Sequence, residues 1–170
     1  MIVGLDSMIV VYAGVAPSRK QTRPKNFDEL RIRAKILLFQ LARDKATVVF
    51  PTIAVAELLV PVPDAQKGIL IAALNEKFVC GPFDLPASAI AAELWSRHAE
   101  LPKELQYRER HVLKADAMIL AAAKAAGVTE FYSHDRRCRK LAGLIGMKGR
   151  DLPAHGDDLF IEGEIQRGEH

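Results

Sequence analysis

Short apolar runs bounded by charged or turn-forming residues recur along the chain and predict buried strands. The first run ends at Asp6, and the second stops at Pro51, which cannot donate to a sheet ladder. The predicted strands occupy residues 1–5, 47–50, 78–80 and 130–132, and Met147 is predicted to open a last one.

Between these runs, apolar residues recur at helical spacing and predict helices. The predicted ranges are 27–43, 53–60 after a Thr52 cap, 64–75, 86–100, 112–126 and 136–141. Asn26 and Glu29 have the spacing of a capping box at the start of the first helix. Gly127 ends the alanine-rich fifth helix, as glycine commonly does after the last helical turn.

Strands alternating with helices predict an α/β fold with a mainly parallel central sheet and helices on both faces. The 170 residues contain no internal repeat and no linker, so we predict one domain at residues 1–150. Residues 151–170 are rich in Gly, Asp and Glu and lack apolar periodicity. We therefore predict a separate C-terminal tail that is partly disordered.

Membrane insertion, secretion and disulfide bonding are not favoured by this sequence. Residues 115–126 form a long apolar run, but it is broken by charge and too short to span a bilayer. The apolar start runs straight into Asp6 without the basic region of a signal peptide, so we expect a cytoplasmic protein. Cys80 and Cys138 lie far apart and are expected to be reduced, structural thiols.

The formal net charge is only +3, so the distribution of the basic residues matters more than their excess. Three clusters stand out: Arg19, Lys20, Arg23 and Lys25; Lys103, Arg108, Arg110, His111 and Lys114; and Arg136, Arg137, Arg139 and Lys140. Such clusters can attract a phosphate backbone, and they can equally be solvated faces. Both interpretations stay open for each cluster.

Four acidic residues stand out by their position in the predicted fold. Asp6 and Asp135 follow predicted strands, and ligands of open α/β sheets bind beyond the carboxyl ends of strands. Glu57 and Asp116 reach the same edge if their helices begin there. We therefore predict a shared site at this edge, formed by Asp6, Glu57, Asp116 and Asp135.

Each acid also has a purely structural interpretation. Asp6 can be a turn residue, Asp116 a helix cap or first-turn acid, and Asp135 the cap of the following helix. Glu57 is harder to explain in this way because its neighbours in the predicted helix are apolar, and an unpaired buried carboxylate is costly. We expect Glu57 to have a cation or strong hydrogen bonds nearby.

If the four carboxylates converge, a proton or a cation must compensate their mutual repulsion. Oxygen ligands without a supporting His or Cys suit Mg²⁺ or Mn²⁺. Such an ion can activate water and stabilise a phosphoryl group under attack. Carboxylates, a hard metal and basic surroundings together predict hydrolysis of phosphodiester bonds.

Four segments carry a family resemblance. Leu5-Asp6-Ser7, residues 54–59, residues 115–123 and Ser133-His134-Asp135-Arg136 resemble, in order and approximate spacing, the four motifs of PIN-domain nucleases. The chain looks most like the VapC-type toxin ribonucleases of VapBC toxin–antitoxin pairs. The likeness covers roughly residues 1 to 145, and the ordered set of four motifs is more specific than any one of them.

The resemblance implies a three-layer α/β/α fold and an Mg²⁺- or Mn²⁺-dependent endoribonuclease, often a homodimer, silenced by a cognate antitoxin. It implies that Asp6, Glu57, Asp116 and Asp135 form the acidic, metal-binding quartet and that Ser7 and Ser133 support it by hydrogen bonding. Met8 departs from the family, which often has Asn or Ser there. The toxin role follows less directly, because such toxins are usually shorter.

Several other residues near the motifs have candidate roles. We predict that Lys114, His134 and Arg136 contact RNA, with His134 pointing away from Asp135 because side chains alternate along an extended chain. Trp95 is predicted to be a packing anchor.

Three alternatives to a toxin ribonuclease stay open at this stage. A phosphoacceptor receiver domain also places acids at strand ends, but it needs adjacent acids after the first strand and a late lysine, and neither pattern is clear. A PIN-like module that binds RNA without cleaving it is the second. A PIN nuclease that acts in RNA processing rather than as a toxin is the third.

Overall fold

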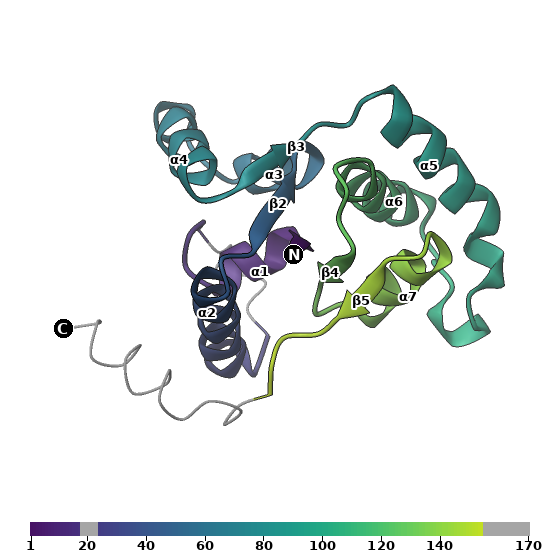
Figure 1. Cartoon of the computed structure of the whole chain (residues 1–170), viewed down its shortest axis with the longest axis horizontal. Coiled ribbons are helices and arrows are strands. Elements are labelled where there is room, and N and C mark those ends of the chain that lie inside the picture. The colour runs from purple at the N-terminus through teal and green to yellow at the C-terminus, as the bar shows by residue number, and fades with distance from the viewer. Residues whose placement is uncertain (18–23, 155–170) are drawn as a thin grey trace.

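The computed structural model describes residues 1–17 and 24–154, and its centre is a sheet of five parallel strands (Figure 1). The strands are β1 (Ile2–Leu5), β2 (Thr47–Pro51), β3 (Val79–Gly81), β4 (Glu130–Tyr132) and β5 (Lys148–Arg150). Their order in the sheet is β3-β2-β1-β4-β5, and each neighbouring pair is parallel. The predicted α/β fold with a mainly parallel sheet is confirmed.

Helices cover both faces of this sheet. They are α1 (Ser7–Tyr12), α2 (Phe27–Arg43), α3 (Thr52–Leu59), α4 (Asp64–Lys77), α5 (Leu85–Arg97), α6 (Arg110–Ala125) and α7 (Arg136–Leu144), with short 3₁₀ turns η2 (His98–Glu100) and η3 (Lys103–Leu105). In Figure 1, α1, α2 and α4 lie to the left of the sheet, and α5, α6 and α7 lie to its right. The arrangement is the expected three-layer α/β/α fold.

The central strand β1 is apolar because both of its faces are covered. Val3 and Leu5 are fully buried, as are Phe50 in β2 and Phe131 in β4. Parallel sheets covered by helices on both sides favour such continuous hydrophobic strands. The burial of these side chains anchors β1 between β2 and β4, so that the three strands end at the same edge of the sheet.

Two predicted helix caps are wrong, and one cap was not predicted. Asn26 precedes α2 with φ −100° and ψ 28°, outside the extended region of an N-cap, and its side chain makes no capping bond. Thr52 is the first residue of α3, and Pro51 holds the N-cap position. By contrast, the carboxylate of Asp84 accepts a hydrogen bond of 3.0 Å from the backbone N–H of Ala87 and caps α5.

The first residues beyond the predicted domain boundary lie against α2. The guanidinium of Arg33 donates to the carbonyl oxygens of Pro153 at 2.7 Å and Leu152 at 2.9 Å, and Leu152 is buried. The boundary at residue 150 stays a prediction. Residues 155–170, where disorder was predicted, lie outside the described part of the chain. Among the helices of residues 1–17 and 24–154, none has the length and apolar character needed to cross a bilayer.

Candidate active site

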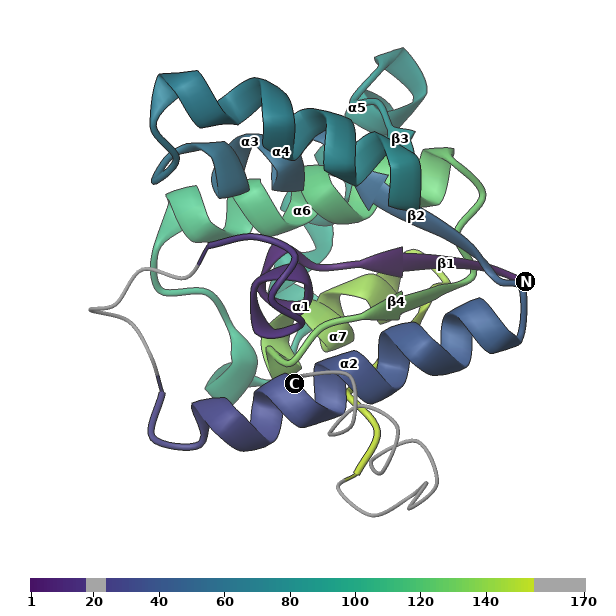
Figure 2. The same cartoon turned by 90° about the vertical axis from the view of Figure 1, so that its left-hand side faces the viewer.

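The four predicted acids come from four different elements that meet beyond the carboxyl ends of the strands. Asp6 follows β1, and its backbone N–H donates to the carbonyl of Tyr132 at the end of β4 at 3.0 Å. Asp135 follows β4 and precedes α7, while Glu57 lies on α3 and Asp116 on α6. Figure 2 shows α1, α3 and one end of α6 gathered at this edge of the sheet.

The carboxylate of Asp6 is held by two serine hydroxyls rather than used as a helix cap. Ser133 Oγ donates to Asp6 Oδ2 at 2.7 Å, and Ser7 Oγ lies 3.3 Å from Asp6 Oδ1. Asp6 occupies the N-cap position of α1, but its side chain makes no capping bond. Burial raises the pKa of Asp6 above its ordinary value, and the Ser133 hydrogen bond only partly opposes this shift. The two serines therefore orient a carboxylate whose ionised form is disfavoured by burial.

Glu57 shares the Ser7 hydroxyl with Asp6. Ser7 Oγ donates to Glu57 Oε2 at 2.9 Å, and since one hydroxyl carries one proton, the shorter contact to Glu57 is the favoured donation. Glu57 is exposed, because the face of α3 that packs into the core carries Ala54 and Leu58. The prediction of a buried carboxylate at Glu57 is therefore wrong, whereas the hydrogen bond expected near it is present. Partial desolvation still raises the pKa of its carboxyl, and the charge of Asp6 adds to the shift.

Asp116 is a third acid whose pKa is raised by its surroundings. Burial raises its pKa to about 7, the hydroxyl of Tyr107 opposes the shift, and the charges of Asp6, Asp135 and Glu57 add to it. Tyr107 donates to Asp116 Oδ2 at 2.7 Å. Because α6 begins at Arg110 rather than at 112, Asp116 lies beyond the first turn and does not act as the helix cap.

Asp135 combines a structural and an electrostatic role. Its carboxylate accepts from the backbone N–H of Arg137 at 2.7 Å, so it caps α7, and it pairs with the Arg137 guanidinium at 3.0 Å. Burial alone would raise the pKa of Asp135, but these contacts to Arg137 together lower it. Asp135 therefore remains ionised and adds negative charge beside Asp116.

This donor set fits a hard divalent cation in its chemistry. It consists of carboxylate oxygens, and each added negative charge raises the pKa of a neighbouring carboxyl, so a cation would relieve the repulsion. Within residues 1–17 and 24–154, however, no three His, Cys, Asp or Glu side chains lie close enough together to hold a metal ion as they stand. Coordination would require these carboxylates to exchange contacts with serine, tyrosine and arginine for a shared ion.

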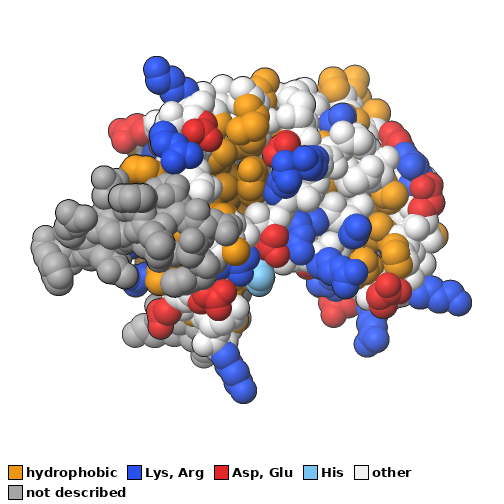
Figure 3. Space-filling view, turned by 60° about the horizontal axis from the view of Figure 1, so that its bottom comes forward, with side chains coloured by type: hydrophobic (Ala, Val, Ile, Leu, Met, Phe, Trp, Pro, Cys, Tyr) orange, Lys and Arg blue, Asp and Glu red, His pale blue; other side chains and the backbone are white. Residues whose placement is uncertain are grey.

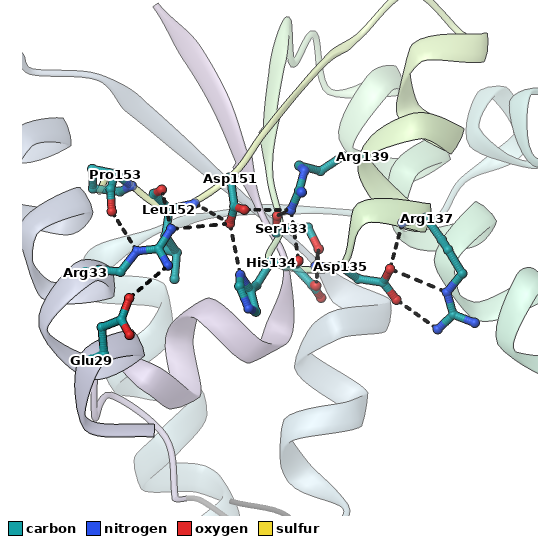
Figure 4. A network of polar contacts seen from close by, with 11 residues as sticks. Glu29, Arg33, Ser133, His134, Asp135, Arg137, Arg139, Asp151, Leu152 and Pro153 are labelled. Atoms are coloured by element: carbon teal, nitrogen blue, oxygen red, sulfur yellow. Dashed lines mark hydrogen bonds and ion pairs between the residues drawn. The ribbon is translucent and has the colours of Figure 1, made fainter. Parts of the chain in front are cut away.

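The predicted RNA-contacting residues have different surroundings. Figure 4 shows His134 turned toward Asp151, whose carboxylate lies 3.0 Å from His134 Nδ1. Arg136 is exposed. Lys114 is also exposed, and its Nζ lies 5.6 Å from the centre of the Trp95 ring. Only His134 is engaged by a carboxylate of the described residues. Arg19, Lys20 and Arg23 of the first basic cluster lie outside that part of the chain.

Three residues that shape the site were given no individual role from the sequence: Tyr107 was not named, and Arg137 and Arg139 were named only as members of a basic cluster. Tyr107 holds Asp116, and the Arg137 guanidinium pairs with Asp135 and lies 5.3 Å from the centre of the Tyr107 ring. Arg139 donates to the carbonyls of Ser133 at 2.7 Å and His134 at 2.8 Å and so fixes the loop after β4 (Figure 4). The sequence feature that could have drawn attention to Tyr107 is its position as an aromatic residue within the polar, basic segment of residues 101–111.

Comparisons with known proteins bear on the family and the fold of the chain. The PIN-domain family model matches residues 27–144. No curated protein matches the chain. Among solved structures, VapBC2 from Rickettsia felis, in a complex with a DNA fragment from its promoter, shares 15% identity at a TM-score of 0.58, covering 90% of this chain and 100% of that one.

Two further structures are similar at the level of the fold. VapBC-1 from nontypeable Haemophilus influenzae shares 18% identity at a TM-score of 0.57 over 89% of this chain and 98% of that one. FitAcB from Neisseria gonorrhoeae shares 20% identity at a TM-score of 0.53 over 88% and 96%. With the family model matching most of the chain and the three-layer fold shared along nearly all of it, the chain belongs to the family of PIN-domain nucleases.

Proposed function

We propose that this protein is an endoribonuclease that hydrolyses RNA with Mg²⁺ or Mn²⁺ held by Asp6, Glu57, Asp116 and Asp135. The observation that carries the proposal is the meeting of the four acids at one edge of the sheet, where Ser7 Oγ contacts both Asp6 and Glu57. Burial and the charges of the three other carboxylates accordingly raise the pKa of Asp116 to about 7. Perturbed carboxyls gathered at one edge of a parallel sheet are a common feature of functional sites. Oxygen donors of this kind favour hard divalent ions.

The chain's own residues position and compensate these acids. Ser133 orients Asp6, Ser7 links Asp6 to Glu57, and Tyr107 holds Asp116 by its hydroxyl. When bound, the divalent ion would lower the pKa of a coordinated water and stabilise charge on the phosphoryl group.

Arg137 supplies positive charge beside the acids. Its guanidinium contacts Asp135 through Nε and Nη2 and lies 5.3 Å from the centre of the Tyr107 ring, so Nη1 is the donor left for a substrate phosphate.

The first test is cleavage of a single-stranded RNA. We expect turnover with Mg²⁺ or Mn²⁺, loss of turnover with a chelator, and a loss of at least about 100-fold in Asp6→Asn, since the carboxylate's charge on the ion is removed while its shape is kept. The matched control is Asp28→Asn, an exposed acid in the first turn of α2, which should cleave like the wild type.

Two outcomes of this assay would contradict the proposal. Cleavage that survives both the chelator and Asp6→Asn would exclude a metal centre at these acids. RNA binding without turnover under all metal conditions would favour the alternative of a catalytically inactive RNA-binding module.

We further propose that the protein is the toxin of a type II toxin–antitoxin pair, is a homodimer and has a cognate antitoxin as its partner. The shared fold with VapBC2 of Rickettsia felis and VapBC-1 of Haemophilus influenzae supports this role. Expression in a bacterial host should arrest growth, Asp6→Asn should not, and co-expression of the small protein encoded next to this gene should restore growth. RNA cleavage without growth arrest would favour a nuclease of RNA processing instead.

A further inference from the structure

A cavity of about 300 Å³ opens beside the candidate active site, between the end of α5 and the start of α6. Its walls combine the aromatic side chains of Trp95 and Tyr107 with the cationic side chains of Arg108, Arg110 and Lys114. Figure 3 has the side of α5, α6 and α7 on the right, and Lys and Arg side chains gather there with hydrophobic side chains among them. The cavity is therefore both positively charged and aromatic.

Trp95 is not the packing anchor predicted from the sequence. It is the only tryptophan of the chain, and 36% of the residue's accessible surface stays exposed. The ammonium of Lys114 lies 5.6 Å from the centre of its ring, within the range of a cation–π contact. An exposed indole with a cation at its face provides a surface on which a flat, electron-rich ring can stack beside a negative charge.

The cations of this cavity lack acidic partners. Among the described residues, no carboxylate pairs with Arg108, Arg110 or Lys114, while Glu109 lies 3.1 Å from His111 instead. Such cations on an open helix face would be explained by solvation alone. Here they line a concave site together with two aromatic rings, which favours an anionic ligand that also carries an aromatic group.

Tyr107 joins the cavity to the carboxylates. Its ring lines the cavity, and its hydroxyl donates to Asp116 Oδ2 at 2.7 Å. A ligand in the cavity is therefore separated from Asp116 by one tyrosine side chain. The volume is at the lower end of the range of about 300–1,000 Å³ for small-ligand sites, which favours a single nucleotide over a peptide or a duplex.

We propose that this cavity binds one nucleotide of a single-stranded RNA substrate, with its base stacked on Trp95 and its phosphate at Arg108, Arg110 and Lys114. The substrate class rests on the proposed function, and the cavity adds the requirement for an unpaired base. Bases within a duplex are stacked on each other and cannot lie against a side chain, whereas the splayed bases of single strands stack on aromatic rings.

The single tryptophan makes the cavity directly observable, because all tryptophan fluorescence of the chain comes from Trp95. We would titrate the wild type, in chelator so that no RNA is cleaved, with a single-stranded oligoribonucleotide of mixed sequence. Saturable quenching is expected from the single strand. Much weaker quenching is expected from the same sequence as a duplex and from an oligoglutamate of equal charge.

Substitutions then separate stacking from charge, with affinity measured by the anisotropy of a labelled RNA. Trp95→Leu should weaken binding about tenfold, within the range for loss of one base–aromatic stack, whereas Trp95→Phe keeps a ring and should retain most of the affinity. Lys114→Gln should weaken binding several-fold and reduce its salt dependence. Lys77→Gln removes an exposed lysine of α4 and should bind like the wild type.

Cleavage and binding are read separately, so the two proposals can fail independently. RNA cleavage with an unchanged KM and an unchanged affinity in Trp95→Leu would overturn the nucleotide site and leave the ribonuclease standing. Quenching and a Trp95-dependent affinity without any cleavage would support the nucleotide site and contradict the ribonuclease. Equal quenching by the oligoglutamate would identify a surface for acidic protein and overturn the nucleotide site.

Discussion

Replacing Asp116 with asparagine is expected to lower RNA cleavage by at least about 100-fold and, at the same time, to stabilise the metal-free protein. The loss follows from removing a charge that would hold the divalent ion. The gain follows from the pKa of Asp116, which burial and three neighbouring carboxylates raise from 3.8 to about 7. At pH 8 the folded protein carries this charge at a cost of at most about 4 kcal/mol, which asparagine removes.

The two effects are measured on the same preparation. Cleavage of single-stranded RNA is followed with Mn²⁺, and urea unfolding is followed at pH 8 in chelator. The asparagine keeps an acceptor for the Tyr107 hydroxyl, so the local hydrogen bond need not be lost. Asp28→Asn again serves as the control and should change neither quantity appreciably. A variant that is both inactive and less stable would identify Asp116 as a structural carboxylate rather than a group kept for function.

The position of Asp6 and Asp135 directly after predicted strands was sufficient to predict that these two acids lie at one edge of the sheet, whereas Glu57 and Asp116 were placed there only on the condition that their helices begin at that edge. Asp6 and Asp135 lie after strands, and parallel strands all end at the same edge, so convergence follows from the topology. The apolar runs that define β1 and β4 depend on local pattern alone, as does the helical periodicity of residues 27–43. These features were therefore visible without the structure.

The sequence did not predict contacts that depend on which face of a helix is turned toward the core. The run from Ile53 to Val60 is apolar apart from Glu57, which suggested a buried carboxylate. The structure instead buries only Ala54 and Leu58 of α3 and leaves Glu57 exposed. A pattern with apolar residues at nearly every position does not define which face meets the core. The same ambiguity applied to Trp95. A large apolar side chain favours burial, yet the position of Trp95 on α5 leaves it exposed.

Contacts made across loops were also beyond the reach of the sequence. The Tyr107 hydroxyl meets Asp116 from the segment between η3 and α6, nine positions earlier in the chain. From the sequence, Arg137 was only a member of a basic cluster. In the structure, the Asp135 carboxylate that caps α7 contacts both the backbone N–H and the guanidinium of Arg137. Loop conformation decides such pairs, and periodicity carries no information about it.

The metal-free protein is expected to lose stability as the pH rises from 5 to 8. Asp116 has a folded pKa of about 7 against 3.8 when unfolded, and the pKa values of Asp6 and Glu57 are also raised. Within this window the unfolded chain has released protons that the folded protein still holds, so deprotonation favours unfolding as the pH increases. Carboxyls with lowered pKa values, such as Asp135, act in the opposite sense and only at pH values near or below 4.

The midpoint of thermal unfolding in chelator should fall by about 5–10 °C between pH 5 and pH 8, since 1 kcal/mol corresponds to roughly 2–4 °C in a domain of this size. Mg²⁺ or Mn²⁺ should reverse the loss, because an ion that binds only the folded state stabilises it and replaces the protons on the carboxyls. The reversal should be large at pH 8 and small at pH 5, where protons compete with the ion.

Asp116→Asn separates this behaviour from that of other titrating groups, because it removes the carboxyl whose pKa is raised to about 7 and leaves the rest of the chain unchanged. Its unfolding midpoint should depend less on pH between 5 and 8, and added Mn²⁺ should raise it by less than in the wild type. Equal pH profiles for the two proteins, or an equal response to Mn²⁺, would mean that the repulsion among these four acids is not what a cation relieves. In that case the contacts of the four acids with Ser7, Ser133, Tyr107 and Arg137 would serve only to stabilise the fold.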